Sequence, residues 1–175
     1  MFDVLHPPRT IYQIWESLPE GTMCQIINNT LVTSPSPLDI HQVILNEINV
    51  NLTLYVRKTK IGYVRISPYD VHLSESNILQ PDICFIAEEN KNIIEKNGVT
   101  GAPDLVIEIL SPGTKKYDLT NKKEIYETYG VKEYFIVEPT NKKVKSFFLK
   151  NNKYIESSET MGIIKSALLN ANIEF

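Results

Sequence analysis

The sequence predicts a mixed α/β (α+β) fold, in which helices flank a central β-sheet that contains both parallel and antiparallel strands. Helical and strand patterns are interspersed along the 175 residues without the regular alternation of a doubly wound protein. Two apolar, β-branched segments, Val106 to Leu110 and Tyr134 to Val137, are typical of interior strands. A helical pattern separates them, which predicts one parallel, right-handed crossover between neighbouring strands.

Length and composition are those of one soluble globular domain, which we expect to span residues 1–175. Hydrophobic residues make up 42% of the chain and charged residues 22%, and no apolar run approaches the ~20 residues of a membrane span. Met1 to Pro8 lacks the basic start and the apolar stretch of a signal peptide. Cys24 and Cys84 are too few for a disulfide framework or a zinc module, so we expect a cytoplasmic protein that makes no membrane contact.

The N-terminal third of the chain predicts two helices separated by a hairpin. Thr10 is a suitable N-cap for a short helix that ends near Leu18, and Asn28-Asn29 favours a hairpin turn. Ser36-Pro37-Leu38-Asp39 offers an N-cap followed by proline at the first helical position, which predicts a helix to about Val56. The inner stripe of this helix is expected to contain His41, Ile44, Leu45, Ile48, Leu52 and Tyr55.

The rest of the chain predicts strands, one more helix and a late hairpin. The helix begins near Asp118 and ends at Tyr129, because Gly130 is a typical residue after a helix C-terminus. The polar residues 88–100 predict a loop or a short helix, and Asn151-Asn152 predicts the turn of the hairpin. The predicted strands cover residues 61–66, 71–73, 82–87, 106–110, 134–137, 144–149 and 154–155.

Charge is unevenly distributed along the chain. The net charge of −3 gives no global sign of nucleic-acid binding, yet residues 115–153 contain ten lysines and only five acidic residues. This basic stretch is compatible with contact to a phosphate backbone. The alternative is a lysine-rich, solvated surface with no partner.

Glu108 is the first of three residues that suggest a catalytic site. In a strand, alternate residues share a face, so Glu108 emerges between Val106 and Leu110. A carboxylate among apolar neighbours is unfavourable by several kcal/mol unless a metal, a cation or hydrogen bonds meet it. The alternative is a glutamate at a strand end that reaches solvent or pairs with a structural lysine.

Asp82 and Lys122 are the other two candidate site residues, and both are expected to lie near Glu108. Asp82 follows Pro81 at the entry to a predicted strand, and Mg²⁺ typically takes one or two protein carboxylates together with water and phosphate oxygens. Lys122 lies on the apolar, inward face of its helix, and helical side chains lean toward the helix N-terminus, here toward the loop after the Glu108 strand. The alternatives are a turn aspartate and an Asp118–Lys122 surface pair.

Other candidate residues are weaker. His41 lies on the inner stripe of the long helix and could approach the site, although a buried structural histidine is the simpler interpretation. The three histidines lack the spacing of a metal module, and Ser111 lacks the context of a serine hydrolase nucleophile. The sequence contains no glycine-rich phosphate loop.

At these residues the chain resembles a known family, the Uma-type restriction endonucleases of the PD-(D/E)xK nuclease superfamily. The resemblance rests on Pro81-Asp82, on the segment from Gly101 to Pro112, on Asp118 and Lys122 four residues apart, and on the segment from Tyr126 to Pro139. It covers about residues 8–150, and the segment between 101 and 139 is its specific part.

The resemblance implies a restriction endonuclease-like fold. We expect a DNA substrate and a homodimer. The resemblance implies that Asp82 and Glu108 bind Mg²⁺ or Mn²⁺ with help from the carbonyl of Ile109. It also implies that Lys122 orients the attacking water and stabilises charge on the phosphate. Gln25 and Asp118 are possible accessory residues, as is His41.

The sequence departs from the family pattern at two positions. The usual superfamily lysine, two residues after the glutamate, would fall at Leu110, so the lysine is relocated to the helix. Gln25 is neutral where relatives often carry a carboxylate.

The first interpretation is therefore a divalent-metal-dependent DNA endonuclease. The intact set of Asp82, Glu108 and Lys122 favours it. The second is a catalytically silent nucleic-acid-binding or scaffold protein of the same fold, which Gln25 and the acidic net charge favour. A third is a metal-dependent hydrolase of another phosphorylated substrate.

Overall fold

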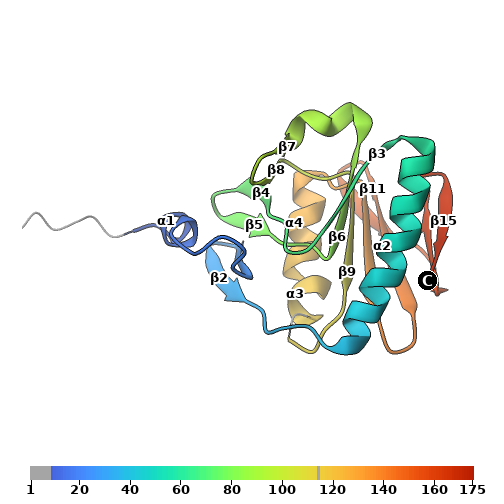
Figure 1. Ribbon diagram of the computed structural model, residues 1–175, viewed down its shortest axis with the longest axis horizontal. Helices are drawn as coiled ribbons and strands as arrows, with labels where there is room; N and C mark the ends of the chain where they lie inside the picture. The colour runs from blue at the N-terminus through green and yellow to red at the C-terminus, as the bar shows by residue number, and fades with distance from the viewer. Residues whose placement is uncertain (1–8, 114) are drawn as a thin grey trace, which may run out of the picture.

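A seven-stranded sheet forms the centre of the protein, and helices cover both of its faces (Figure 1). The structure, a computed structural model, describes residues 9–113 and 115–175, so the signal-peptide prediction for residues 1–8 lies outside the described part, and the single domain over 1–175 stays a prediction. The strands of the sheet are, in spatial order, β12 (Lys153–Glu156), β11 (Lys143–Lys150), β10 (Glu133–Glu138), β9 (Leu105–Ile109), β6 (Ile83–Ala87) and β3 (Gly62–Ile66), with β13 (Thr160–Met161) beside β11.

The sheet is mixed, as the sequence predicts. β9 and β10 run parallel, and the other neighbouring strands of the sheet pair antiparallel. Asn151 and Asn152 turn the hairpin between β11 and β12 with φ of 51° and 59°. The predicted parallel pairing around the interior strand β9 is therefore confirmed.

Short strands build a second sheet that the sequence predicts only in part. Its order is β2 (Thr30–Thr33), β1 (Cys24–Ile27), β5 (Asn77–Leu79), β4 (Val71–Ser74), β8 (Gly98–Thr100) and β7 (Ile94–Glu95). A 3₁₀ helix, η1 (Glu88–Ile93), precedes β7, and the hairpin of β14 (Ile163–Ser166) and β15 (Ala171–Glu174) forms a separate pair. The unpredicted strands β5, β7 and β8 have two or three residues each, too few to show a period of two.

The first two helices lie where the sequence predicts them, but three of their four boundaries are shifted by two or three residues. α1 (Ile11–Glu16) begins with a capping box between Thr10 and Gln13. α2 (Asp39–Thr59) begins after Leu38, which is extended at ψ 157°, so the prediction of Ser36 as N-cap is wrong. Two prolines hold residues 34–37 away from helical geometry, and Asp39 supplies the negative charge that favours the first turn.

The last predicted helix is two helices. α3 (Lys115–Leu119) and α4 (Asn121–Tyr129) are separated at Thr120, whose φ of −125° and ψ of −86° are not helical. The Thr120 hydroxyl donates to the carbonyl of Lys116 at 2.6 Å, a back-bond that bends helices. Asp118 and Lys122 therefore lie on successive helices, and Gly130 caps the second with φ of 89°.

Two apolar cores lie on the two faces of the central sheet. Leu105, Ile107 and Ile109 of β9 pack in the core under α2, whereas Val106 and Leu110 pack in the core under α4. Glu108 alternates with these residues and so belongs to the α4 face, as the strand pattern predicts. Within the described residues, no helix combines the length and the apolar character that a membrane crossing requires.

Candidate active site

The register of two strands brings Asp82 and Glu108 together. β6 and β9 pair antiparallel, with Ile83 opposite Ile107. Asp82 lies one residue before β6, so the same register places it level with Glu108. Residues that face each other across antiparallel strands point to the same side, which explains why the two carboxylates line one cavity.

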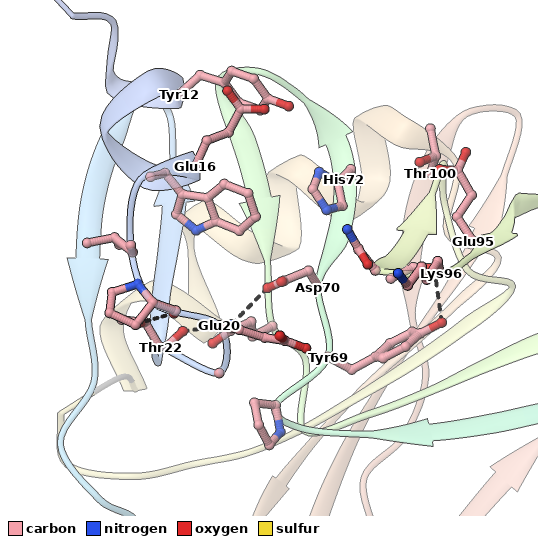
Figure 2. Close-up of a pocket in the computed structure, with 18 residues that line it drawn as sticks. Tyr12, Glu16, Glu20, Thr22, Tyr69, Asp70, His72, Glu95, Lys96 and Thr100 are labelled. Atoms are coloured by element: carbon pink, nitrogen blue, oxygen red, sulfur yellow. Dashed lines mark hydrogen bonds between the residues drawn. The ribbon is translucent and has the colours of Figure 1, made fainter.

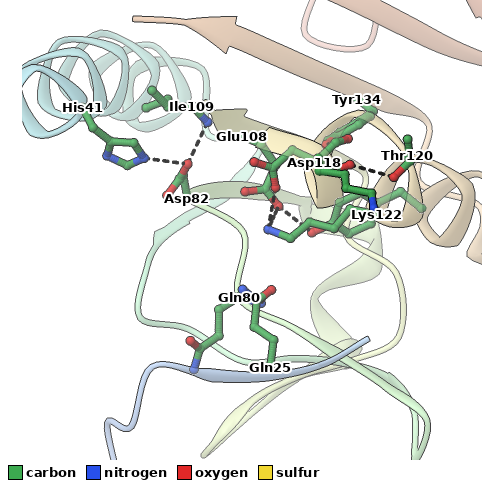
Figure 3. Close-up of polar contacts among 12 residues, drawn as sticks. Gln25, His41, Gln80, Asp82, Glu108, Ile109, Asp118, Thr120, Lys122 and Tyr134 are labelled. Carbon is green, nitrogen blue, oxygen red and sulfur yellow. Dashed lines mark hydrogen bonds and ion pairs between the residues drawn. The ribbon is translucent and has the colours of Figure 1, made fainter. Parts of the chain in front are cut away.

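Glu108 is held in a buried cluster with a lysine and a tyrosine (Figure 3). Its Oε1 accepts from Nζ of Lys122 at 2.9 Å and from the hydroxyl of Tyr126 at 3.0 Å. Lys122 also lies 3.0 Å from Oδ1 of Asp118, whose carbonyl accepts from the hydroxyl of Tyr134. Glu108 and Lys122 are each 2% exposed, and Asp118 is 1% exposed. Lys122 therefore points inward, as the sequence predicts, and the Asp118–Lys122 pair is buried and does not lie at the surface.

Asp82 is anchored by the backbone of β9 and by a side chain of α2. Its Oδ2 accepts from the backbone amide of Ile109 at 2.7 Å and lies 3.1 Å from Nε2 of His41. His41 comes from the first turn of α2 and is buried, with its Nδ1 unpartnered among the described residues. His41 therefore contacts a predicted site residue, as the sequence allowed.

Both carboxylates are anchored through only one oxygen. Among the described residues, both contacts of Asp82 end on Oδ2, and both contacts of Glu108 end on Oε1. Oδ1 of Asp82 and Oε2 of Glu108 thus remain as candidate ligands of a hard cation. Among the described residues, no three His, Cys, Asp or Glu side chains gather as candidate metal ligands. Mg²⁺ typically takes only one or two protein carboxylates, together with water and phosphate oxygens.

Electrostatics in the cluster also favour a cation. Burial raises the pKa of Glu108 to about 8, the charge of Lys122 opposes this shift, and the charges of Asp118 and Asp82 add to it. Burial lowers the pKa of Lys122, but the charges of Asp118 and Glu108 outweigh burial and raise it above its usual value. Three carboxylates thus face one ammonium group. When all three are ionised, a divalent cation would offset the excess of two negative charges.

The pKa of His41 reflects its contact with Asp82. Burial lowers this pKa, but the hydrogen bond and the negative charge of Asp82 outweigh burial and raise it above its usual value. The carbonyl of Ile109 contributes in the same direction. The predicted role of that carbonyl as a metal ligand stays a prediction.

A cavity of 560 Å³ opens onto this cluster. Its walls include Asp82, Glu108, Lys122 and His41, together with the strap of residues 34–38 and the loop of residues 111–113. Gln25 lines the same cavity, across from the cluster in Figure 3, and its Oε1 accepts from the backbone amide of Gln80 at 3.0 Å. An accessory role for Gln25 therefore stays a prediction.

Two features of the site escaped the sequence. Tyr126 lies four residues after Lys122, on the same face of α4, and its hydroxyl donates to Glu108, a contact that the sequence does not predict. A second Pro-Asp pair, Pro103-Asp104, is structural: Asp104 accepts from the amide of Ala87 at 2.8 Å and from Asn90 at 2.7 Å. Its pKa is lowered, because burial, which raises it, is outweighed by the bonds from Lys132, Ala87 and Asn90.

A second, larger cleft lies outside the cluster (Figure 2). It measures 720 Å³ and is lined by α1 and by the strands β4, β7 and β8. Aromatic and acidic side chains dominate its walls, which also carry one lysine: Tyr12, Trp15, Tyr69, His72, Glu16, Glu20, Asp70, Glu95 and Lys96. A search by size alone would choose this cleft as the functional site. The buried ionic cluster lines the smaller cavity instead.

The lysine-rich stretch of residues 115–153 is largely neutralised. Seven of its ten lysines form ion pairs with carboxylates, namely Lys115, Lys122, Lys132, Lys142, Lys143, Lys145 and Lys153. Lys123 lies over the ring of Phe147, 4.3 Å from its centroid. The structure therefore favours the solvated surface over a dedicated phosphate-binding stretch.

Comparisons with known proteins agree with the geometry. A crystal structure described as "a putative nuclease belonging to DUF820 from Anabaena variabilis ATCC 29413" shares the fold, with a TM-score of 0.70, 19% sequence identity and coverage of 85% of this chain and 84% of that chain. No curated protein matches the chain. The family described as "Uma2: Putative restriction endonuclease" matches residues 11–168. Since this match covers most of the sequence, the chain belongs to the Uma2 family of putative restriction endonucleases.

Proposed function

We propose that the protein is a Mg²⁺- or Mn²⁺-dependent DNA endonuclease that hydrolyses phosphodiester bonds as a cytoplasmic homodimer. One observation carries the proposal: two carboxylates share a cavity with a buried lysine, and each keeps one oxygen that accepts no hydrogen bond from the described residues. Structural ion pairs rarely combine near-complete burial with a cavity, because burying charges is unfavourable and needs a compensating gain.

The residues of the chain would divide the work. Oδ1 of Asp82 and Oε2 of Glu108 would hold the metal, which when bound lowers the pKa of water and offsets charge on the phosphate. Lys122 keeps its proton at neutral pH, because its pKa is raised, and so offers a fixed positive charge to a phosphate oxygen and a donor that orients water.

The anchoring residues would limit reorganisation during the reaction. His41 and the Ile109 amide fix Asp82, while Tyr126 and Lys122 fix Glu108. Groups held in this way need not rotate or desolvate when substrate binds, which is how preorganised sites lower an activation barrier.

Nicking of supercoiled DNA in the presence of Mg²⁺ or Mn²⁺ tests the activity. We expect the wild type to nick, and we expect Asp82→Ala and Lys122→Ala to lose at least ~10²-fold in rate. Exposed Lys150→Ala is the matched control and should nick at the wild-type rate. A wild type that leaves DNA intact with either metal, at any enzyme concentration, would reject the nuclease proposal.

Calorimetry tests the metal separately from the reaction. We expect Mn²⁺ to release or absorb heat on binding to the wild type and to give no binding heat with Glu108→Ala. Absence of heat in both proteins would remove the metal from the proposal.

A silent nucleic-acid-binding or scaffold protein is the second candidate. Gln25 stands where relatives often have a carboxylate, and the net charge of the chain is −3. This candidate predicts DNA retention without nicking, and retention that survives Asp82→Ala. A nuclease loses nicking in the same variant while retention stays.

A further inference from the structure

The outer face of α2 carries an apolar stripe that nothing in the described structure covers. The stripe consists of Ile40, Val43, Val50 and Leu54, which are 40%, 42%, 44% and 61% exposed. Their spacing of three, seven and four residues is the a/d spacing of a helix that packs against another helix. We call these four residues the outer stripe.

A helix on the surface of a globular protein needs only one apolar face. α2 already buries Ile44, Ile48, Leu52 and Val56 against the central sheet. Among the described residues, nine large apolar side chains are exposed, and five of them lie on α2 or at its N-cap. Isolated exposed apolar residues are ordinary, but a row along one helix of 21 residues indicates a contact surface.

Charge along α2 selects one kind of partner. Asp39 lies at the N-terminal end, whereas Arg57, Lys58 and Lys60 lie at the C-terminal end. An antiparallel copy of the same helix would place each acidic end beside a basic end, and would also align the helix dipoles favourably. A parallel copy would place like charges together. The helix is thus complementary to itself when reversed.

We propose that the outer stripe is the interface of a homodimer, in which α2 packs antiparallel against α2 of a second copy about a two-fold axis near Glu47. Ile40 would then contact the partner's Leu54, and Val43 the partner's Val50. Glu47 at the centre is paired with Lys142 at 2.9 Å, so the axis would not bring two unpaired carboxylates together. Such an interface is isologous, as two-fold dimers require.

This interface deepens the homodimer in the proposed function, and it also links the two candidate active sites. His41 lies on the same helix, six residues from the axis, and contacts Asp82. Two copies of His41 would lie about 18 Å apart along the paired helices. The dimer would therefore present two sites at opposite ends of one shared, rigid element.

Sedimentation velocity between about 1 μM and 1 mM tests the dimer, because an interface built on one helix pair is small and should associate weakly. We expect the mass to rise toward twice 20.0 kDa with concentration. Leu54→Glu should weaken association at least ~10-fold, whereas Ile155→Glu, a substitution at a comparably exposed apolar residue elsewhere, should leave it unchanged. A monomer at every concentration, or equal association in both variants, would overturn the proposal.

Disulfide cross-linking tests the orientation. The native Cys24 and Cys84 are 2% and 1% exposed, so an introduced surface cysteine would react in their place. A mixture of Ile40→Cys and Leu54→Cys should form a mixed disulfide dimer, and Ile40→Cys alone should not dimerise covalently. Self-linking of Ile40→Cys without the mixed product would indicate parallel helices and contradict the proposal. Neither assay uses DNA or metal, so a failed dimer and a failed nuclease are told apart.

Discussion

The two cavities of this protein share part of a wall, but the charged groups that line them differ in exposure: they are mostly buried in one cavity and mostly exposed to solvent in the other. Pro68 and Gln80 line both the cavity at the ionic cluster, of 560 Å³, and the aromatic cleft, of 720 Å³. In the first, a carboxylate and an ammonium group are both about 2% exposed and bonded to each other. In the second, exposed Glu20 and Glu95 stand in contact with solvent.

The difference shows that burial of charge distinguishes the cavities better than volume does. An exposed carboxylate keeps most of its hydration and leaves the folded state nearly unaffected. A buried one must be compensated by neighbours fixed in position, so its presence constrains several elements at once. The ionic cluster draws on the residue before β6 and on β9, α2, α3 and α4.

Removing the lysine from each cavity should give the largest contrast. Lys122→Met leaves the buried carboxylates of Glu108 and Asp118 without their cation, and we expect it to lower the free energy of unfolding by about 3–5 kcal/mol. Lys96→Met in the aromatic cleft should change it by less than about 0.5 kcal/mol. Urea denaturation measures both. Equal, small effects would mean that the cluster is hydrated and would remove the contrast.

Divalent metal should stabilise through one cavity and not the other. At about 100 times its dissociation constant, Mn²⁺ should raise the free energy of unfolding of the wild type by about 2.7 kcal/mol. Asp82→Asn should abolish this gain, whereas Asp70→Asn in the aromatic cleft should keep it. Thermal unfolding with and without metal measures both effects. If Asp70→Asn abolished the stabilisation by metal, the metal would bind in the aromatic cleft and the proposed site would be wrong.

Paired tyrosine substitutions should give a smaller contrast. Tyr126→Phe removes a buried hydrogen bond to Glu108, and we expect a loss of about 1–3 kcal/mol because a buried acceptor loses one of its partners. Tyr12→Phe at the rim of the aromatic cleft should lie within about 0.5 kcal/mol of the wild type. If Tyr126→Phe were as mild as Tyr12→Phe, Glu108 would not depend on this bond.

The smallest effect should come from adding a charge to the wall of the cavity at the ionic cluster. Gln25→Glu keeps an oxygen for the Gln80 amide and adds a carboxylate across from the cluster. We expect Mn²⁺ affinity to increase a few-fold, about 1 kcal/mol, through a longer-range attraction. Gln25→Met, which adds no charge, should not increase it, and a matching gain there would assign the effect to packing.

Local patterns predicted much of this architecture, and the reasons are visible in particular residues. The period of two along β9 predicts the face on which Glu108 lies, and the apolar face of α4 predicts that Lys122 points inward. Asn151-Asn152 and Gly130 marked turns because few other residues tolerate positive φ.

Other features depended on contacts that sequence spacing does not encode. The break at Thr120 arises from a hydroxyl that bonds the backbone, and a threonine in a polar helix gives no warning of it. The contact between His41 and Asp82 joins residues 41 positions apart through the packing of α2 on the sheet. The two-residue delay at the start of α2 reflects extended geometry at Leu38 that overrode a good capping pattern.

The bonds made by Asp104 have a consequence for how this protein can change. They join Ala87, the last residue of β6, and Asn90, within η1, to the residue before β9, and so they close the base of the excursion through η1, β7 and β8. Whatever the length of that excursion, the chain leaves the sheet after β6 and returns to it at β9 at the same points. Asp82 and Glu108 therefore keep their relative positions. New sequence inserted at the turn between β7 and β8 would therefore sit on a closed loop, and the family could acquire additional modules there while its reactive centre stays in place.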